Sequence, residues 1–84
     1  LPQSKTSEVT GKVTDRSGSP LPGVTILIKG TSLGTVTDTE GIFKIALPQK
    51  KDVVLVFSFI GMKTQEIVLK DDKPLKVVMQ EDAK

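Results

Sequence analysis

Residues 18–30 read GSPLPGVTILIKG, and this stretch decides the fold. Pro20 and Pro22 fix two φ angles and remove two backbone donors, so no strand can run through this corner. After Gly23, residues 24–28 form a run rich in β-branched residues. This run is apolar on one face and half apolar on the other. Such a run is typical of a strand inside a sheet, covered on both faces or nearly so, and not of an exposed edge strand. The sequence therefore predicts a central strand over 24–29.

Alternating apolar and polar residues predict six further strands, with turn signals between them. The run VVLVFSFI is apolar on both faces, which indicates a second central strand. No segment shows a helical period, so parallel crossovers are excluded and the sheets are expected to be mainly antiparallel. We predict an all-β, seven-stranded, antiparallel β-sandwich with Greek-key connections. The six further strands are expected at 8–15, 35–37, 42–47, 53–60, 63–69 and 75–80.

One turn chemistry occurs twice, because the hexapeptide VTDRSG recurs as VTDTEG with four of six positions unchanged. In each copy the aspartate, Asp15 or Asp38, can accept hydrogen bonds from nearby backbone amides. The final glycine, Gly18 or Gly41, can take a positive φ. The flanking sequences differ, so we interpret this as one turn used twice and not as an internal repeat. The other expected structural turn residues are Pro22, Gly23 and Gly61.

The composition describes a small, weakly charged domain. The chain has 84 residues, of which 37% are hydrophobic, and it has no Trp or Tyr, so Phe43, Phe57 and Phe59 are the expected core anchors. Twelve basic and ten acidic residues give a net charge of +2 and are spread along the chain, which argues against nucleic-acid binding. No apolar run is long enough to cross a bilayer, so no direct membrane insertion of this fragment is expected.

The sequence offers no catalytic arrangement. Cysteine and histidine are both absent, which excludes disulfides, thiol nucleophiles, Cys/His zinc sites and the usual general base. Asp15, Asp38 and Glu40 lie in glycine-containing turns, but each turn supplies only one or two carboxylates, too few for calcium. The loop GTSLG lacks the lysine and the helix of a phosphate-binding loop. We expect no enzyme activity, no catalytic residue, no metal and no cofactor.

An apolar group at Phe59, Ile60 and Met62 is the candidate interaction patch. If these side chains emerge at the end of their strand, they form a docking surface for a neighbouring domain or a partner protein. If they cover the end of the sandwich instead, they belong to the core. The sequence leaves both alternatives open.

Five motifs follow one another between residues 8 and 80: V-x-G-x-V-x-D, P-L-P-G-V, K-G-T, G-T-x-T-D-x-x-G and F-S-x-I-G-x-K-T-Q-E. In this order they resemble the carboxypeptidase regulatory-like domain at the N-terminus of SusC/RagA-type TonB-dependent receptors of the Bacteroidetes outer membrane. The sequence departs from the family around the Ile60-Gly61 dipeptide. There Phe59 and Met62 stand where the family often carries aromatic residues, which puts any polar contact by a tyrosine hydroxyl in doubt.

The resemblance implies a transthyretin-like or Ig-like sandwich on the periplasmic side of the outer membrane, ahead of the plug and barrel of a receptor. Such receptors import glycans or other large nutrients and are energised through TonB. The domain would be a non-catalytic accessory that acts by protein interaction or by positioning the receptor's N-terminus. The implied partners are the plug and barrel, and TonB or another periplasmic or outer-membrane protein.

Two other functions stay open at this point. One is a carbohydrate-binding β-sandwich module, which the lack of Trp and Tyr as stacking platforms disfavours. The other is a stabilising appendage of a peptidase or cell-surface protein, because fold does not determine function. We expect a flexible leader over 1–7, the domain over 8–80 and the start of a linker over 81–84.

Overall fold

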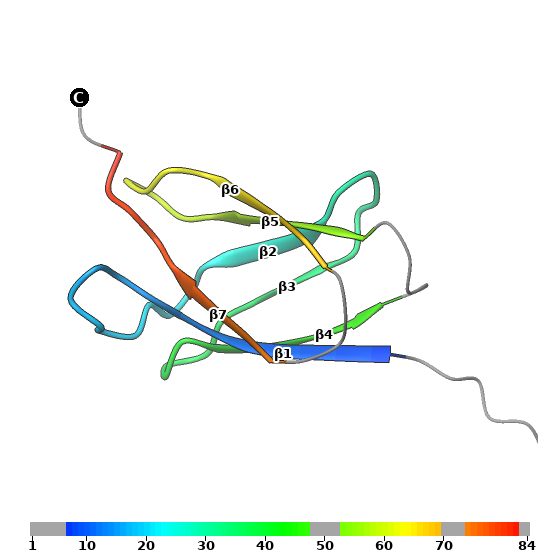
Figure 1. Ribbon diagram of the computed structural model, residues 1–84, viewed down its shortest axis with the longest axis horizontal. Coiled ribbons are helices and arrows are strands. Elements are labelled where there is room, and N and C mark those ends of the chain that lie inside the picture. Colours follow the sequence, from blue (N-terminus) through cyan, green and yellow to red (C-terminus); the bar gives the residue numbers. More distant parts are fainter. Residues whose placement is uncertain (1–6, 48–52, 70–73, 83–84) are drawn as a thin grey trace, which may run out of the picture.

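The computed structural model describes residues 7–47, 53–69 and 74–82, which form two packed β-sheets (Figure 1). One sheet has the strand order β4-β1-β7 and the other β3-β2-β5-β6. Among these residues there is no helix with the length and apolarity needed to cross a membrane. The predicted all-β sandwich is confirmed. Its strands are β1 (Ser7–Thr14), β2 (Thr25–Ile28), β3 (Gly34–Val36), β4 (Ile42–Leu47), β5 (Val54–Ser58), β6 (Gln65–Val68) and β7 (Leu75–Val78).

The strand limits are close to the predicted ones. The strand β4 matches the prediction, whereas β2, β5, β6 and β7 are each shorter than predicted at one or both ends. Ser7, which we assigned to the leader, begins β1. The predicted turn over 48–52, most of the turn over 70–74, and the rest of the leader lie outside the described residues.

The first and last strands pair in parallel, unlike the other strand pairs. The pairs β1–β4, β2–β3, β2–β5 and β5–β6 are antiparallel, as predicted, but β1 and β7 run in the same direction, with Thr14 opposite Val78. Excluding parallel crossovers did not exclude this pair. The chain reaches β7 only after passing through the other sheet, so no direct crossover connects the two parallel strands.

The core lies between the two sheets and is built from the inward faces of the strands. The rings of Phe43 and Phe57 meet edge to face, with centroids 5.6 Å apart and planes at 70°. Phe59, the third predicted anchor, is only partly buried at the rim of the core. The buried apolar residues are Val9, Val13, Val24, Ile26, Ile28, Phe43, Ile45, Leu47, Val53, Leu55, Phe57, Leu69, Val77 and Met79.

The two predicted central strands are internal, and their outward residues are half-buried except for one exposed position on β2. The strand β2 lies between β3 and β5, and β5 lies between β2 and β6. On the outward face of β2, however, Leu27 is 39% exposed. The expectation that β2 is covered on both faces, or nearly so, is therefore wrong at Leu27, because each sheet of a two-layer sandwich packs against only one other layer.

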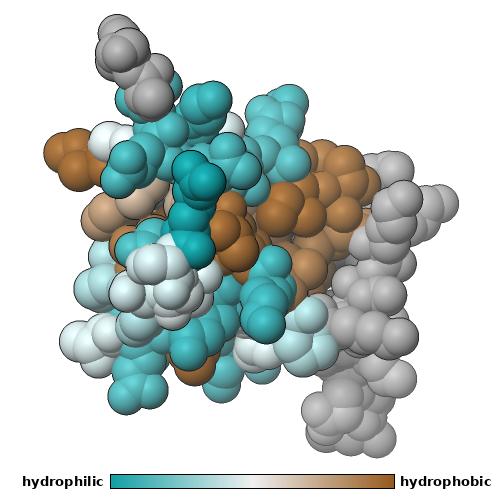
Figure 2. Space-filling model, turned by 60° about the vertical axis from the view of Figure 1, so that its left-hand side comes forward, coloured by the Kyte–Doolittle hydropathy of each residue, from teal (hydrophilic) through white to brown (hydrophobic). Residues whose placement is uncertain are grey.

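Hydrophilic side chains cover most of the face drawn in Figure 2, and an apolar area is exposed between them. Exposed apolar residues occur on several strands and in two of the loops of the described part of the chain. Those with large exposed side chains are Leu27, Leu33, Val36, Ile42, Ile60, Val68 and Val78.

Candidate interaction site

Three segments meet at one end of the sandwich, which we call the exit end. They are the turn 15–18 after β1, the turn 59–62 between β5 and β6, and the segment 79–82 after β7 (Figure 1). The exit end contains all three residues of the predicted interaction patch, together with Asp15. The other predicted aspartate turn, around Asp38, precedes β4.

The Asp15 side chain closes the first turn of the exit end. Its Oδ1 accepts hydrogen bonds from the Ser17 amide at 2.9 Å, the Ser17 hydroxyl at 2.7 Å and the Ser19 amide at 3.0 Å. The Ser17 hydroxyl first, and then the Ser19 amide, hold the pKa of the Asp15 carboxyl below its ordinary value. The carboxylate therefore stabilises the turn by accepting hydrogen bonds from it, which is the role that the sequence predicted for both aspartates.

The predicted interaction patch is divided by the structure. The Met62 amide donates to the Phe59 carbonyl at 3.0 Å and closes a turn in which Gly61 has φ 76°. This turn places Ile60 at its tip, where the side chain is 88% exposed. Phe59 and Met62 are partly buried and pack against the core. Ile60 is therefore exposed enough to contact a partner, whereas Phe59 and Met62 cover the end of the hydrophobic core.

The chain after β7 continues along this turn. The Lys63 amide donates to the Gln80 carbonyl at 2.8 Å, and the Asp82 amide donates to the Gly61 carbonyl at 3.0 Å. Met62 and Glu81 form an isolated antiparallel bridge between these two bonds. Glu81 and Asp82, which we assigned to a linker, are therefore still paired with the sandwich, Asp82 through its amide hydrogen bond and Glu81 through the bridge to Met62.

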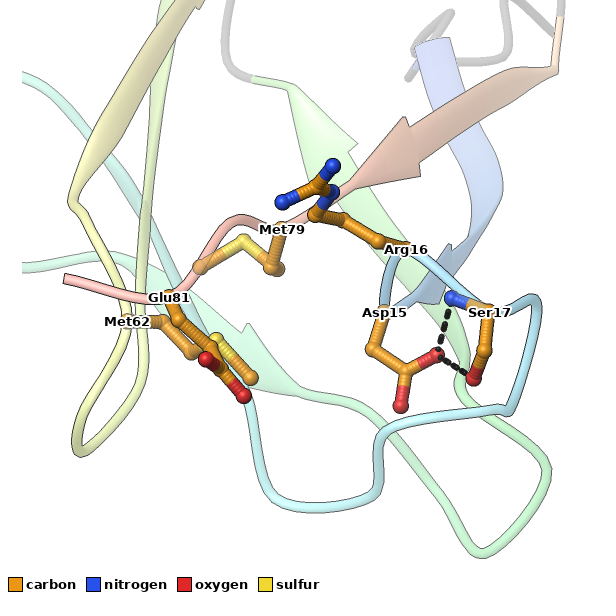
Figure 3. Close-up of a pocket in the computed structure, with 6 residues that line it drawn as sticks. All are labelled: Asp15, Arg16, Ser17, Met62, Met79 and Glu81. Atoms are coloured by element: carbon orange, nitrogen blue, oxygen red, sulfur yellow. Dashed lines mark hydrogen bonds between the residues drawn. The ribbon is translucent and has the colours of Figure 1, made fainter. Parts of the chain in front are cut away.

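A shallow hollow of about 400 Å³ lies between the first turn and the exit segment (Figure 3). Figure 3 shows Asp15 and Ser17 on one side of it and Met62 and Glu81 on the other. The part of the chain that the structure describes contains no group of three or more Asp or Glu that could hold a metal ion. In the lining of the hollow, the Asp15 carboxylate is occupied by the hydrogen bonds of its own turn, and the Met62 and Met79 side chains supply an apolar wall.

Thr37 is a structural residue that the sequence analysis missed. Its buried hydroxyl accepts from the Val24 amide at 2.9 Å and donates to the Leu21 carbonyl at 2.6 Å. The Gly23 amide also donates to the Thr37 carbonyl, at 3.1 Å. Thr37 therefore attaches the proline corner to the end of β3. Its position within the repeated hexapeptide is shared by Thr14, so the local sequence does not distinguish it.

The expected structural glycines all lie at turns. Gly18, Gly23, Gly41 and Gly61 have positive φ, between 75° and 92°. Pro22 is exposed beside Gly23, at the corner that precedes β2. These placements match the turn positions that the sequence indicated.

Comparison with protein-family models gives a match to the CarboxypepD_reg-like domain over residues 9–84, nearly the whole chain. The chain belongs to the CarboxypepD_reg-like domain family. The five sequence motifs therefore identified the family correctly. The matched region includes residues 81–84, beyond the predicted domain end.

Curated relatives of this CarboxypepD_reg-like domain are TonB-dependent receptors. It is 42% identical over 74 residues to TonB-dependent receptor P39 of Formosa agariphila, covering 88% of this chain. It is 39% identical over 72 residues to TonB-dependent receptor SusC of Bacteroides thetaiotaomicron, covering 76% of this chain. The chain spans only 7% of the length of each of these relatives. Its sequence therefore corresponds to a small segment of such receptors.

Solved structures support the fold. A chain of a type II cohesin–X–dockerin complex from Acetivibrio cellulolyticus, carrying a C-terminal interface mutation, matches with a TM-score of 0.70 and 24% identity. The match covers 87% of this chain and 56% of that one. At this identity the likeness shows a shared sandwich fold and nothing about function.

Proposed function

We propose that this CarboxypepD_reg-like domain is a non-catalytic accessory domain of a TonB-dependent outer-membrane receptor, on the periplasmic side. In this proposal the parent imports a glycan or another large nutrient through its plug and barrel. The domain contributes by holding the chain before it and the chain after it at a defined separation, and by contact with a partner protein. The support from relatives is that similar segments lie within TonB-dependent receptors.

The observation that carries the proposal is the parallel pairing of β1 and β7. The chain enters β1 at Ser7 and leaves the sandwich beyond Asp82, and Thr14 and Val78 are level in the register. At about 3.3 Å per residue, the two ends are separated by roughly 35 Å. An antiparallel first and last strand would bring the two ends together. The parallel pair instead makes the domain an in-line spacer, and Figure 1 shows the start of β1 and the segment after β7 on opposite sides of the sandwich.

The exit end supports a positioning role as well. The segment that leaves the domain is held by two backbone hydrogen bonds, Lys63 amide to Gln80 carbonyl and Asp82 amide to Gly61 carbonyl. These bonds fix the direction of the chain as it leaves. A following segment would therefore start from a defined place beside the exposed Ile60.

The test is a replacement in the parent receptor. Deleting the domain is expected to leave the receptor in the outer membrane but to reduce nutrient uptake. Replacing it with an unrelated β-sandwich whose ends are also about 35 Å apart is expected to restore uptake if spacing alone matters. Failure of that replacement, with the native domain active, would assign the role to a specific contact. Unchanged uptake after deletion would contradict the proposal.

A further inference from the structure

The outer face of the β4-β1-β7 sheet gathers three lysines that are far apart in the sequence. Lys12 on β1 and Lys76 on β7 are register partners on adjacent parallel strands, so their Cα atoms are about 4.8 Å apart. Lys44 on β4 is the register partner of Thr10, which places it diagonally from Lys12. All three side chains are exposed. We call the surface formed by Lys12, Lys44 and Lys76 the lysine face.

Among the described residues the lysine face carries one carboxylate, Glu8 on β1, which lies diagonally from Lys44 and forms no ion pair with it. The one ion pair in the described part of the domain joins Lys29 and Glu66 at 3.0 Å, on the other sheet, and none of the three lysines is paired with a described carboxylate. Like charges directly opposite each other on neighbouring strands are destabilising. The pairing of Lys12 with Lys76 is therefore expected to cost stability.

Two apolar side chains lie among these lysines. Ile42 is the register partner of Lys12 on β4, and Val78 follows Lys76 on the same face of β7. They are 43% and 44% exposed. Clustered cations beside exposed apolar side chains can steer and orient an oppositely charged protein surface. No aromatic residue on the face could stack a nucleobase.

We propose that the lysine face docks an acidic protein surface, in which carboxylates surround an apolar patch that meets Ile42 and Val78. The inference rests on the proposed accessory role and specifies its partner by charge. Three lysines near an anionic bilayer supply only about 1 kcal/mol each, too little for stable membrane attachment. The mixed apolar and cationic character therefore favours a protein over a lipid surface.

The first test is zero-length carbodiimide cross-linking of the parent receptor in its outer membrane, followed by peptide mapping. The link between Lys29 and Glu66 is the internal positive control, because their charged atoms are 3.0 Å apart. We expect further links from Lys12, Lys44 or Lys76 to aspartate or glutamate residues outside this domain. Recovery of the control link without any link from the lysine face would overturn the proposal.

The second test is a pair of matched variants. The double variant Lys12→Gln, Lys76→Gln removes two of the cross-linking amines, so the informative readout is the external link from Lys44, which is expected to be lost with the contact. Removal of like-charge repulsion is expected to raise the thermal midpoint of the 84-residue chain by about 1–4 °C. The control Lys63→Gln, an exposed lysine at the exit end, is expected to change neither. Loss of links together with gain of stability separates a docking role from a structural one. A lowered midpoint in the double variant would contradict the inference.

Failure of the lysine-face proposal can be distinguished from failure of the proposed accessory role. If domain deletion impairs uptake while the lysine variants do not, the accessory role stands and the lysine face is not its contact. Binding of the 84-residue chain to phosphatidylglycerol vesicles, lost in the double variant, would assign the face to lipid and overturn the protein partner.

Discussion

The two aspartate turns have nearly the same local geometry but very different surroundings. Asp38 accepts from the amides of Glu40 at 2.9 Å and Ile42 at 3.0 Å, just as Asp15 accepts from the amides of Ser17 and Ser19. In each turn the glycine amide also donates to the aspartate carbonyl, at 3.0 Å from Gly18 and 2.9 Å from Gly41. The hexapeptide therefore specifies one turn in both places.

The surroundings differ at the glycine. A Cβ added to Gly18 would meet nothing within 4 Å, whereas one added to Gly41 would lie 2.5 Å from the Val13 carbonyl oxygen and 3.1 Å from the Leu21 nitrogen. The reason is that Gly41 leads directly into β4, which pairs with β1, and the Val13 amide donates to the Gly41 carbonyl at 2.8 Å. The same turn therefore has open space around its glycine at Gly18, whereas at Gly41 the glycine packs tightly against the backbone of other segments. Four predictions test this contrast.

The largest expected effect comes from Gly41→Ala. The substitution adds a side chain at positive φ and forces it against backbone, so the free energy of unfolding is expected to fall by about 3 kcal/mol or more. Gly18→Ala is the matched control, because it carries the same φ penalty of about 1–2 kcal/mol without a clash. Urea denaturation measures both values. Equal losses would show that the tight packing at Gly41 adds nothing to the turn.

The next effect is expected from Thr37→Val. This change removes the hydroxyl while keeping the shape, which leaves the Val24 amide and the Leu21 carbonyl without their partner. We expect a loss of about 1–3 kcal/mol in unfolding free energy. Thr37→Ser should retain most of the stability, and Thr14→Val, at the equivalent position of the other turn, should cost less. If Thr14→Val costs as much as Thr37→Val, the contrast between the turns is wrong at this position.

A smaller effect concerns acid stability. The pKa of Asp15 is lowered in the folded state, so its charged form contributes stability above the unfolded-state pKa, and that contribution disappears as the pH falls through the folded-state pKa. We therefore expect part of the acid destabilisation below about pH 4 to depend on Asp15. Asp15→Asn should flatten the pH profile in that range. A profile that keeps its shape in the variant would contradict this assignment.

The smallest effect is expected from Ser17→Ala, which removes the hydroxyl that contributes most to the lowered pKa of Asp15. The Asp15 pKa should rise toward its ordinary value, as measured by NMR titration of the carboxyl carbon. The equivalent position in the other turn is Glu40, whose side chain makes no such bond to Asp38 among the described contacts. An unchanged Asp15 pKa would show that the backbone amides alone are responsible.

Local chemistry in the sequence determined much of this protein. The prolines and glycines at the corner before β2 interrupt strand structure and allow a new strand to begin there. Alternating β-branched residues favour the strands, and the aspartate side chains accept the hydrogen bonds that close both turns. These interactions span only a few residues, so they can be predicted from sequence order. The five ordered motifs likewise identified the family.

Only the tertiary structure decided features that depend on register between distant strands. The parallel pairing of β1 and β7, and hence the separation of the chain ends, follows from how the last strand returns to the first sheet. The same pairing places Lys12 beside Lys76, although the basic residues are spread along the sequence. Contacts between segments far apart in the chain also decide which copy of the aspartate turn is packed. Such contacts likewise leave Ile60 exposed and Met62 partly buried.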